Sequence, residues 1–401
     1  MNGNPGNAGR AGGGKNAGRT AGGLNAAQTG GRSNTAQTGG RGNTARTGAR
    51  TNARRGMHAA LLAALMLMAA FAWTKGFWRT TVMSPFHHGF RVATANPHAS
   101  SEARGVLKLL YDIKGQYILS GQHNYLEEPA WHTERVRELT GRAPAVVGFE
   151  LGAIMDYAPE DVHEFRSRVV EEAIRASREG SLVTVTWHAA MPGECDCWEF
   201  VHTGSMPREM FAEIVTEGTR LHEEWLRDID EVAFYLKMLR DAHVPVLWRP
   251  YHEMNGNWFW WSGQPAFARL WNLMFDRYVN DHGLDNLLWV WSPAAPNEFA
   301  EPFEPYYVGH RRADVLAVDV YYDEYAASHH DRLAALGEGK PIALGEVGEL
   351  PDAGLLESQN QYVWFLVWGD ELEDSNDRER IEILYGSERV LHRDDLAFLR
   401  R

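Results

Sequence analysis

The stretch "WRPYHEMNGNWFWW", residues 248–261, places a carboxylate, Glu253, beside His252 and among four tryptophans. Burial in apolar surroundings raises the pKa of a carboxyl group, so Glu253 could serve as a general acid at neutral pH. Flat rings around such an acid are typical of a carbohydrate site, because aromatic faces stack on sugars. The alternative is a core strand that runs into an exposed loop. A zinc site of the HExxH type is excluded, since the position of the second histidine is Gly256.

A second carboxylate, Glu346, lies in "LGEVGE" at residues 344–349, again after a short apolar run. Two carboxyl groups about 5 Å apart are what a retaining glycosidase requires. One protonates the leaving oxygen while the other attacks the anomeric carbon, and the acid then becomes the base that activates water. Glu253 and Glu346 form this pair only if the fold brings them together. The alternative for Glu346 is a solvated loop carboxylate beside a turn.

The elements that must position these groups follow a regular alternation. Residues 101–401 alternate helical stretches with eight short apolar runs, which are typical of parallel strands buried on both faces. Segments between them, such as residues 223–243, repeat apolar side chains every three or four positions, as amphipathic helices do. Eight such units in about 300 residues predict an α/β fold, a single (β/α)8 TIM barrel. A doubly wound open sheet is the alternative, but no G-x-G-x-x-G follows the first run.

The active site of such a barrel lies at the carboxyl ends of its strands. The runs predicted as strands are residues 116–124, 144–152, 181–190, 244–253, 286–294, 315–322, 341–349 and 362–370. The first residues of these runs suggest no chemistry, whereas the last residues carry polar or aromatic side chains. These end residues are Gln122, His123, Glu150, Trp187, His188, Arg249, His252, Glu253, Trp291, Asp319, Tyr321, Glu346 and Trp368. The asymmetry indicates a functional site at that end of the barrel.

The stretch around Glu253 resembles the acid/base signature of glycoside hydrolase family 26, the group best known for endo-β-1,4-mannanases. Further likenesses follow in chain order over residues 103–396: "ILSGQHN", "TWH", "VDVYY", "IALGEVGE" and the tail "NDRERIEILYGSERVLHRDDL". The resemblance implies a barrel whose acid/base and nucleophile lie on strands four and seven. Those are the predicted strands that end in Glu253 and Glu346.

By this resemblance, Glu253 is the acid/base and Glu346 is the nucleophile. Arg249 is expected beneath Glu346, where a charge-assisted hydrogen bond would keep that carboxylate ionised. The alternative is a salt-bridged arginine of the barrel. His252 is expected to contact substrate and to orient Glu346. The alternative is that His252 is a buried histidine whose hydrogen bonds are all made within the protein.

Further site residues are implied by the same resemblance. Tyr321 would donate a hydrogen bond to the nucleophile, although Tyr322 competes for this role. His188 would bind a sugar hydroxyl near the scissile bond. Trp258 and Trp368 would be stacking platforms on either side of the cut, with Trp368 under the reacting sugar. Residues that could either line the cleft or serve the packing are His123, Glu150, Asp156, Trp187, Trp260 and Trp261.

The third predicted strand leads into "WHAAMPGECDCWEF", which replaces a polar, often asparagine-containing stretch in many family members. Loops of this kind usually shape the distal minus subsites, so the resemblance fixes the reaction better than the substrate. Cys195 and Cys197 lie here, and they are the two cysteines of the chain. Because so short an intervening chain resists disulfide geometry, we expect two free thiols or one intermolecular bond. Two cysteines alone do not make a metal site.

The charge distribution restricts the class of partner. No Asp or Glu precedes Glu102, and that stretch holds 12 of the 40 Lys and Arg residues. The remainder carries 28 basic and 53 acidic residues, a formal charge of −25. Such a surface lacks the basic footprint that phosphates require, so no nucleic acid is expected as partner. A neutral polysaccharide is the more compatible ligand.

The N-terminal region differs in composition from the rest. Residues 1–56 form a basic Gly/Asn/Thr-rich tail without apolar period, which predicts disorder. Residues 57–73, "MHAALLAALMLMAAFAW", predict a signal peptide or signal anchor, and residues 74–100 a linker to the catalytic domain at 101–401. A buried core helix is the alternative for the hydrophobic segment.

Two arginines, Arg54 and Arg55, precede the hydrophobic segment, so the positive-inside rule places the following chain outside the cytoplasm. "AFA" at residues 70–72 resembles a cleavage site, which leaves both secretion and membrane anchoring open. Met57 could itself be the start of an ordinary signal peptide. We expect an extracytoplasmic protein that contacts the membrane only through residues 57–73.

Together these patterns predict a retaining endo-β-glycanase that cuts β-1,4-mannosidic linkages by double displacement, with neither cofactor nor metal. One alternative is β-1,3-xylanase or mixed-linkage β-glucanase activity, since the catalytic pair is indifferent to the configuration at C2. The other is a membrane-tethered glycan-binding protein without catalysis.

Overall fold

A computed structural model of the chain describes residues 92–155, 157 and 159–399. Eight parallel strands are hydrogen-bonded in the order β2-β3-β4-β5-β6-β7-β8-β1, and β1 also pairs with β2, which closes the barrel. The strands are β1 (Ile118–His123), β2 (Val146–Glu150), β3 (Leu182–Trp187), β4 (Val246–Pro250), β5 (Leu287–Trp291), β6 (Val315–Val320), β7 (Ile342–Val347) and β8 (Tyr362–Val367). Each lies in one of the predicted apolar runs, so the (β/α)8 prediction is confirmed. All eight strands are buried along their length, which explains why the runs are continuous rather than alternating.

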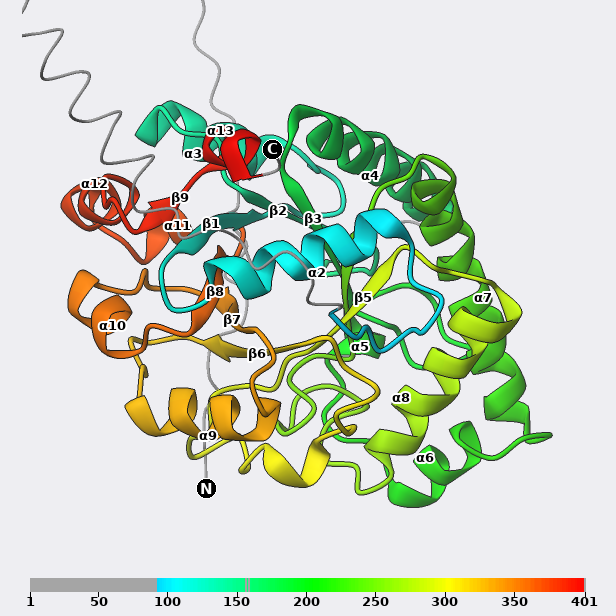
Figure 1. The fold of residues 1–401 in the computed structure, drawn as a ribbon. Helices are drawn as coiled ribbons and strands as arrows, with labels where there is room; N and C mark the ends of the chain where they lie inside the picture. Colours follow the sequence, from blue (N-terminus) through cyan, green and yellow to red (C-terminus); the bar gives the residue numbers. More distant parts are fainter. Residues whose placement is uncertain (1–91, 156, 158, 400–401) are drawn as a thin grey trace, which may run out of the picture. The chain divides into compact units, whose positions relative to one another are not determined.

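Helices surround the strands, with α4 and α7 on one side of the barrel and α9, α10 and α12 on the other (Figure 1). The helices of the described residues are α2 (Ser101–Ile113), α3 (Trp131–Thr140), α4 (Pro159–Glu179), α5 (Trp198–Val201), α6 (Arg208–Ile214), α7 (Arg220–Asp241), α8 (Phe267–Asp276), α9 (Ala327–Gly337), α10 (Ala353–Ser358), α11 (Glu371–Asp374), α12 (Arg378–Tyr385) and α13 (Arg393–Leu399). A π-helix, η1 (Arg277–Asp281), extends α8, and a 3-10 helix, η2 (Glu304–Tyr306), follows β5. A short strand, β9 (Val390–Leu391), pairs with β1 outside the barrel. The predicted helix at residues 223–243 is α7, which buries Trp225, Ile229, Val232 and Leu236 on one face.

The amino end of the barrel is closed by α2. Its Ala103, Leu107 and Leu110 form one apolar cluster with residues at the starts of the strands, such as Leu182 and Val315. Figure 1 looks onto this end, with α2 crossing it. Because the strand starts pack against α2, their residues are apolar, whereas the carboxyl ends of the strands carry the polar side chains.

The segment before α2 also contacts the barrel. The backbone N–H of Ala95 donates to Oδ1 of Asp314 at 2.6 Å, and Nδ2 of Asn96 donates to the carbonyl of Leu284 at 3.1 Å. The tail at 1–56, the hydrophobic segment at 57–73 and most of the predicted linker lie outside the described residues. Within the described part of the chain, no helix combines the length and the hydropathy needed to cross a membrane.

Cys195 and Cys197 form a disulfide in the loop between β3 and α5, with Cα atoms 5.3 Å apart. The expectation of free thiols or an intermolecular bond is therefore wrong. The backbone N–H of Cys197 donates to the carbonyl of Cys195 at 2.7 Å, which makes a tight turn at Asp196. This turn brings the two Cα atoms within the ordinary range for a disulfide, which the short spacing had suggested they could not reach.

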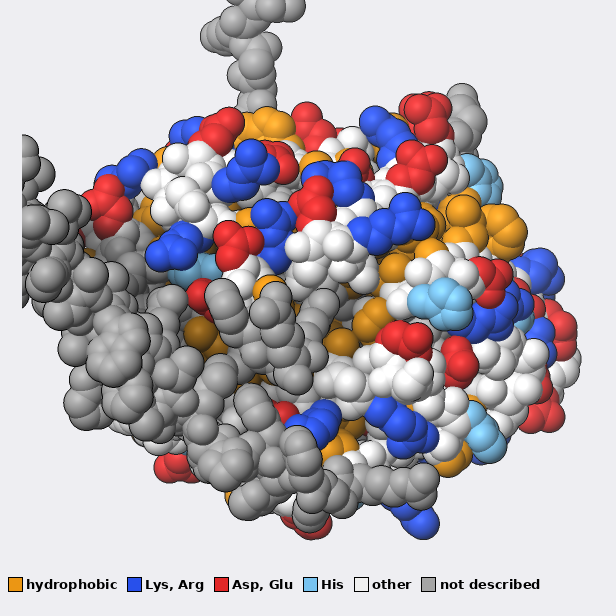
Figure 2. Space-filling model, turned by 45° about the horizontal axis from the view of Figure 1, so that its top comes forward, with side chains coloured by type: hydrophobic (Ala, Val, Ile, Leu, Met, Phe, Trp, Pro, Cys, Tyr) orange, Lys and Arg blue, Asp and Glu red, His pale blue; other side chains and the backbone are white. Residues whose placement is uncertain are grey.

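Charged side chains of both signs share the surface of the barrel. Figure 2 shows a face on which Lys and Arg lie interspersed with Asp and Glu. Several of these charges pair between elements, as Arg393 does with Glu179 at 2.5 Å and Arg332 with Glu304 at 2.5 Å. Such exposed pairs contribute little to stability individually, but they tie neighbouring helices together at the rim.

Candidate active site

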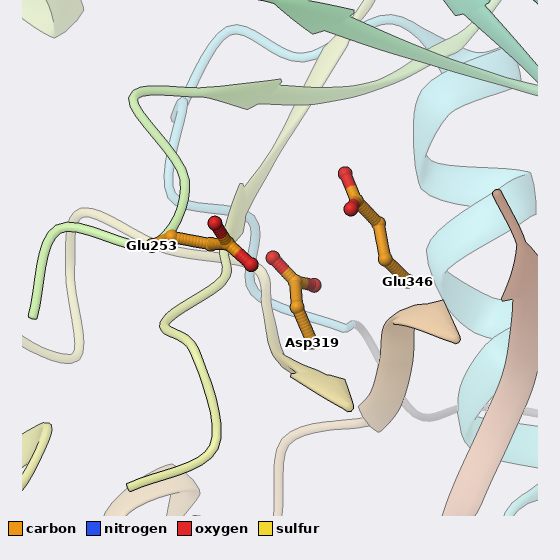
Figure 3. A group of neighbouring side chains, drawn as sticks. All are labelled: Glu253, Asp319 and Glu346. Carbon is orange, nitrogen blue, oxygen red and sulfur yellow. The ribbon is translucent and has the colours of Figure 1, made fainter. Parts of the chain in front are cut away.

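Three carboxyl groups converge at the carboxyl end of the barrel (Figure 3). They belong to Glu253 after β4, Asp319 on β6 and Glu346 on β7, and one oxygen of each lies within 4.8 Å of the others. The two glutamates are far apart in the chain, so only closure of the barrel brings them together. Oxygens of the two glutamates within 4.8 Å of each other are compatible with the roughly 5 Å separation of carboxyl groups that a double displacement requires.

Glu253 is held by an unusual backbone turn at the end of β4. Tyr251 has φ 48° and Glu253 has φ 53°, a left-handed conformation that costs free energy for residues other than glycine. The backbone N–H of Glu253 donates to the carbonyl of Ser292 at 2.7 Å, which ties this turn to the end of β5. The turn aims the carboxyl group inward, toward Asp319 and Glu346 (Figure 3).

The surroundings of Glu253 favour its protonated form. Burial, followed by the negative charge of Glu346, raises the pKa of Glu253 to about 8. The indole N–H of Trp258 donates to Oε2 of Glu253 at 2.7 Å and partly opposes this shift. A Cβ at Gly256 would lie 2.5 Å from the Trp258 ring, so a glycine is needed for the indole to fold back over the loop.

Glu346 has the opposite environment. Its Oε1 accepts a hydrogen bond from Nη2 of Arg249, and its Oε2 accepts one from the hydroxyl of Tyr321 at 2.7 Å. A charge-assisted bond from a buried guanidinium favours the carboxylate form of Glu346. Burial alone would lower the pKa of Arg249, but Glu346 and Asp319 outweigh burial and raise it. Tyr322, the competing tyrosine, is 68% exposed.

Asp319 is a member of the site that the sequence analysis left without a role. Its Oδ2 accepts from Nη1 of Arg249 at 3.0 Å, and its Oδ1 accepts from the hydroxyl of Ser292 at 2.7 Å. Burial raises the pKa of Asp319, and Arg249 opposes that shift. The sequence did contain a signal for this role, since Asp319 is an acid inside the apolar run of β6. A buried carboxyl group needs a partner, so a buried cation could have been expected beside it.

Two histidines lie beside the nucleophile candidate. Nε2 of His252 is 3.8 Å from Oε1 of Glu346, and burial together with Arg249 lowers the pKa of His252 well below its ordinary value. The ring of His188 meets that of His252 edge-on at 4.5 Å. Nδ1 of His188 lies 2.8 Å from Oε2 of Glu150, whose other oxygen accepts the backbone N–H of His188 at 2.9 Å. Glu150 is fully buried, so it positions His188 and does not line the cleft.

Trp368 follows β8 and is half-buried. It stacks on His123 at a ring separation of 4.1 Å and an interplanar angle of 26°. Within the described chain, neither ring nitrogen of His123, nor Nδ1 of His252, has a hydrogen-bond partner. Imidazole nitrogens can donate to or accept from sugar hydroxyls.

The remaining tryptophans near the motif serve the packing. Trp260 and Trp261 are fully buried and donate through Nε1 to the carbonyls of Ala189 and His252, at 2.9 and 2.8 Å. Trp187 is buried against Tyr251. Asp156 lies outside the described residues. These contacts hold the loop that carries Glu253 and Trp258.

Glu253, Asp319 and Glu346 also form the only group of metal-ligand residues with suitable spacing among the described residues. Arg249, however, already donates to both Asp319 and Glu346. A cation would have to compete with this guanidinium for the same oxygens, so the arrangement fits acid–base and nucleophilic chemistry better than metal binding.

Comparisons with known proteins show what this chain is similar to. The profile of Glycosyl hydrolase family 26 matches residues 95–395. A mannan endo-1,4-beta-mannosidase of Thermothelomyces thermophilus is 35% identical over 325 residues, which cover 77% of this chain and 64% of the relative. Mannan endo-1,4-beta-mannosidase A of Piromyces sp. is 29% identical, and the match covers 75% of this chain and 50% of that relative, so the chain spans about half to two thirds of the length of these two relatives.

Solved structures that are similar to this chain include the following two. GH26A from Muricauda sp. has 38% sequence identity and a TM-score of 0.71, and the match covers 75% of this chain and 99% of that one. The GH26-CBM35 beta-(1,4)-mannanase of Podospora anserina has 34% identity and a TM-score of 0.66, with 79% and 71% covered.

Proposed function

Because the chain belongs to glycosyl hydrolase family 26, we propose that it is a retaining endo-β-1,4-mannanase. The single observation that carries this proposal is the meeting of two carboxyl groups, Glu253 and Glu346, whose oxygens lie within 4.8 Å of each other, at a place where burial raises the pKa of Glu253 to about 8. The substrate is proposed from similar proteins that are named mannan endo-1,4-beta-mannosidases.

In the first step, an oxygen of Glu346 attacks the anomeric carbon while Glu253 gives its proton to the leaving glycosidic oxygen. A covalent glycosyl ester forms on Glu346, and the glycosidic bond breaks. In the second step, the ionised Glu253 takes a proton from water, which attacks the same carbon and releases Glu346. Two inversions leave the product with the configuration of the substrate.

The surrounding side chains prepare these steps. Arg249 and Tyr321 each direct a donor at Glu346, so they hold its reactive oxygens in place before attack. His188 and His252 are proposed to bind hydroxyls of the reacting sugar. Trp368 would stack beneath that sugar, and Trp258 is proposed to support the sugar on the leaving-group side.

The test is a product analysis of the purified protein on β-mannan, β-1,3-xylan and lichenan. We expect β-mannan to yield a ladder of oligosaccharides, and proton NMR to show the β-anomer as the first product. Cleavage of β-1,3-xylan or lichenan alone would replace the proposed substrate. Loss of soluble glycan without new reducing ends would identify a binding protein, and an α-anomer as first product would exclude double displacement.

We further propose that the protein works outside the cytoplasm, because residues 57–73 read as a signal or anchor segment after basic residues. Cell fractionation tests this proposal. Activity in the medium or the membrane fraction supports it, and activity confined to the cytosol contradicts it.

A further inference from the structure

Trp131, the first residue of α3, is 50% exposed. It lies at the carboxyl side of the barrel, because α3 begins after the loop that follows β1. An exposed indole face at this side of the barrel is suited to stack on a sugar ring. No role follows for Trp131 from the catalytic mechanism.

A series of rings connects Trp131 with the catalytic centre. The ring of Trp368 lies 6.1 Å from that of Tyr125, which meets His132 edge-on at 4.7 Å. His132 in turn meets Trp131 edge-on at 5.0 Å. Ring contacts, one of them through the buried His132, therefore link the proposed platform under the reacting sugar with the exposed Trp131.

The position of Trp131 relative to Trp368 is fixed by contacts between their segments. Tyr125 packs so closely on Gly369 that any Cβ there would overlap its phenol ring. Arg135 of α3 donates to both carboxylate oxygens of Glu373 on α11, at 2.6 and 2.9 Å. A binding surface that is rigid before the ligand arrives loses less entropy when it binds.

Trp131 also borders an open hollow of about 850 Å³ between α3, α4 and α11. Its lining includes seven glutamates but only two arginines, Arg135 and Arg168. Carboxylates repel an anionic polymer, whereas they accept hydrogen bonds from the hydroxyl groups of a neutral sugar. A basic peptide is the competing occupant, but it would not explain the ring series that leads to Trp368.

We propose that Trp131 is the stacking platform of an outer sugar-binding subsite, which takes a hexose unit of the β-glycan chain on the glycone side. The side follows from the barrel order, since Trp131 follows β1 while Trp258, proposed for the leaving-group side, follows β4 beyond β2 and β3. This inference rests on the proposed function, because it needs a polymeric substrate in the cleft.

The experiment compares kcat and KM of the wild type, Trp131→Ala, Trp131→Phe and Phe234→Ala on β-mannan and on β-1,4-mannooligosaccharides of three and six units. Phe234 is the matched control, an exposed aromatic residue (59%) within α7. For Trp131→Ala we expect kcat/KM on the hexamer and the polymer to fall by roughly three- to tenfold, mainly through KM. The fall on the trimer should be at least threefold smaller, and Trp131→Phe should retain most of the wild-type value.

Two results would overturn the subsite. Equal losses on trimer and hexamer would make Trp131 a structural residue, and unchanged values on hexamer and polymer would leave the hollow to another ligand such as a basic peptide. Failure of the proposed function has a different signature, since the wild type would then cleave no β-mannan. Phe234→Ala should match the wild type on every substrate.

Discussion

At the scale of single residues, the two catalytic candidates differ because their surroundings differ. Burial and the charge of Glu346 raise the pKa of Glu253 to about 8, although the indole N–H of Trp258 partly opposes this shift. Glu346 accepts hydrogen bonds from a guanidinium and from a phenol hydroxyl, which hold its two oxygens in place. Environments that separate the protonation states of two carboxyl groups provide the acid and the nucleophile of one reaction.

This assignment predicts unequal effects of two alanine substitutions. Glu346→Ala should abolish turnover of every substrate, because no nucleophile remains. Glu253→Ala should lower kcat/KM on β-mannan by roughly 10²- to 10⁴-fold. Its loss on an aryl β-mannoside with a good leaving group should be far smaller, because that group needs no proton. Equal losses on both substrates would contradict the acid role of Glu253, and turnover by purified Glu346→Ala would remove the nucleophile assignment.

The pKa of Glu253 predicts the alkaline limb of the pH–rate profile. Because its proton is needed in the first step, kcat/KM should fall as the pH rises through about 8. The indole N–H of Trp258 stabilises the ionised form of Glu253, so Trp258→Phe should raise this pKa and move the limb to higher pH. The pH at the midpoint of this limb can be measured even if Trp258→Phe lowers the overall rate. A limb that moves to lower pH would contradict the hydrogen bond.

The same pKa has a consequence for stability. A carboxyl group whose pKa is raised from 4.5 to about 8 by folding contributes stability in full below 4.5 and loses it as the pH rises through 8. Glu253→Gln carries no charge at any pH. Its free energy of unfolding relative to the wild type should therefore increase between pH 4.5 and 8 and then level off, in urea titrations at a series of pH values. A difference that is constant with pH would mean that Glu253 has an ordinary pKa.

Motif chemistry predicted the residues that meet at the site, but not the contacts that support them. Glu253, Glu346, Arg249 and Tyr321 all stand at predicted strand ends, and the resemblance to family 26 selected them from the other residues there. Asp319 is the second acceptor of Arg249 because of the way the strands are arranged in the barrel. That arrangement cannot be derived from the residue types of a single sequence.

At the scale of elements, the Asp319 side chain on β6 lies directly against the backbone of β7 while it accepts a hydrogen bond from Arg249 on β4. Gly345 makes this possible, since a Cβ there would lie 2.5 Å from Oδ1 of Asp319 and would also meet the hydroxyl of Ser292. The pairing of β6 with β7 shifts register between Val318 and Asp319, at the same place. The glycine and the irregular register together make room for the charged network.

We therefore predict that Gly345→Ala lowers the free energy of unfolding by about 1–3 kcal/mol, because the added methyl group overpacks this junction. It should also lower kcat, because Asp319 and through it Arg249 would shift. Gly105→Ala is the matched control, since Gly105 is exposed within α2 and an added Cβ meets nothing within 4 Å. That change should leave kcat unaltered and stabilise the protein by about 0.4–1 kcal/mol. Wild-type stability and kcat in Gly345→Ala would refute the close approach.

The loop between β3 and α5 shows where prediction at the level of elements fails. Its disulfide was not expected, because the spacing of Cys195 and Cys197 describes the chain length and not the turn at Asp196. The strands themselves were predicted because burial on both faces imposes continuous apolar runs. Loops are restricted by local backbone geometry instead, and residue types alone seldom determine that geometry.

At the scale of the whole molecule, the repeated pattern of apolar runs and amphipathic helices predicted closure of the barrel, and closure is what brings Glu253 and Glu346 together. The packing of Ala95 and Asn96 before α2 was not predicted, since nothing in their residue types distinguishes them from a linker. The described residues of the unit that contains the site are 92–155, 157 and 159–399.

A chain that starts at residue 85 should therefore fold and retain the full kcat/KM on β-mannan. Every residue placed at the site lies within this unit, and so do both apolar clusters that form the core. Thermal unfolding should be cooperative, with an activity per mole equal to that of the full chain assayed in detergent. A chain that starts at residue 101 is the informative comparison, because it also lacks Ala95 and Asn96, which bond Asp314 and Leu284. It should unfold at a lower temperature, and an identical temperature would mean that these contacts add nothing to the barrel.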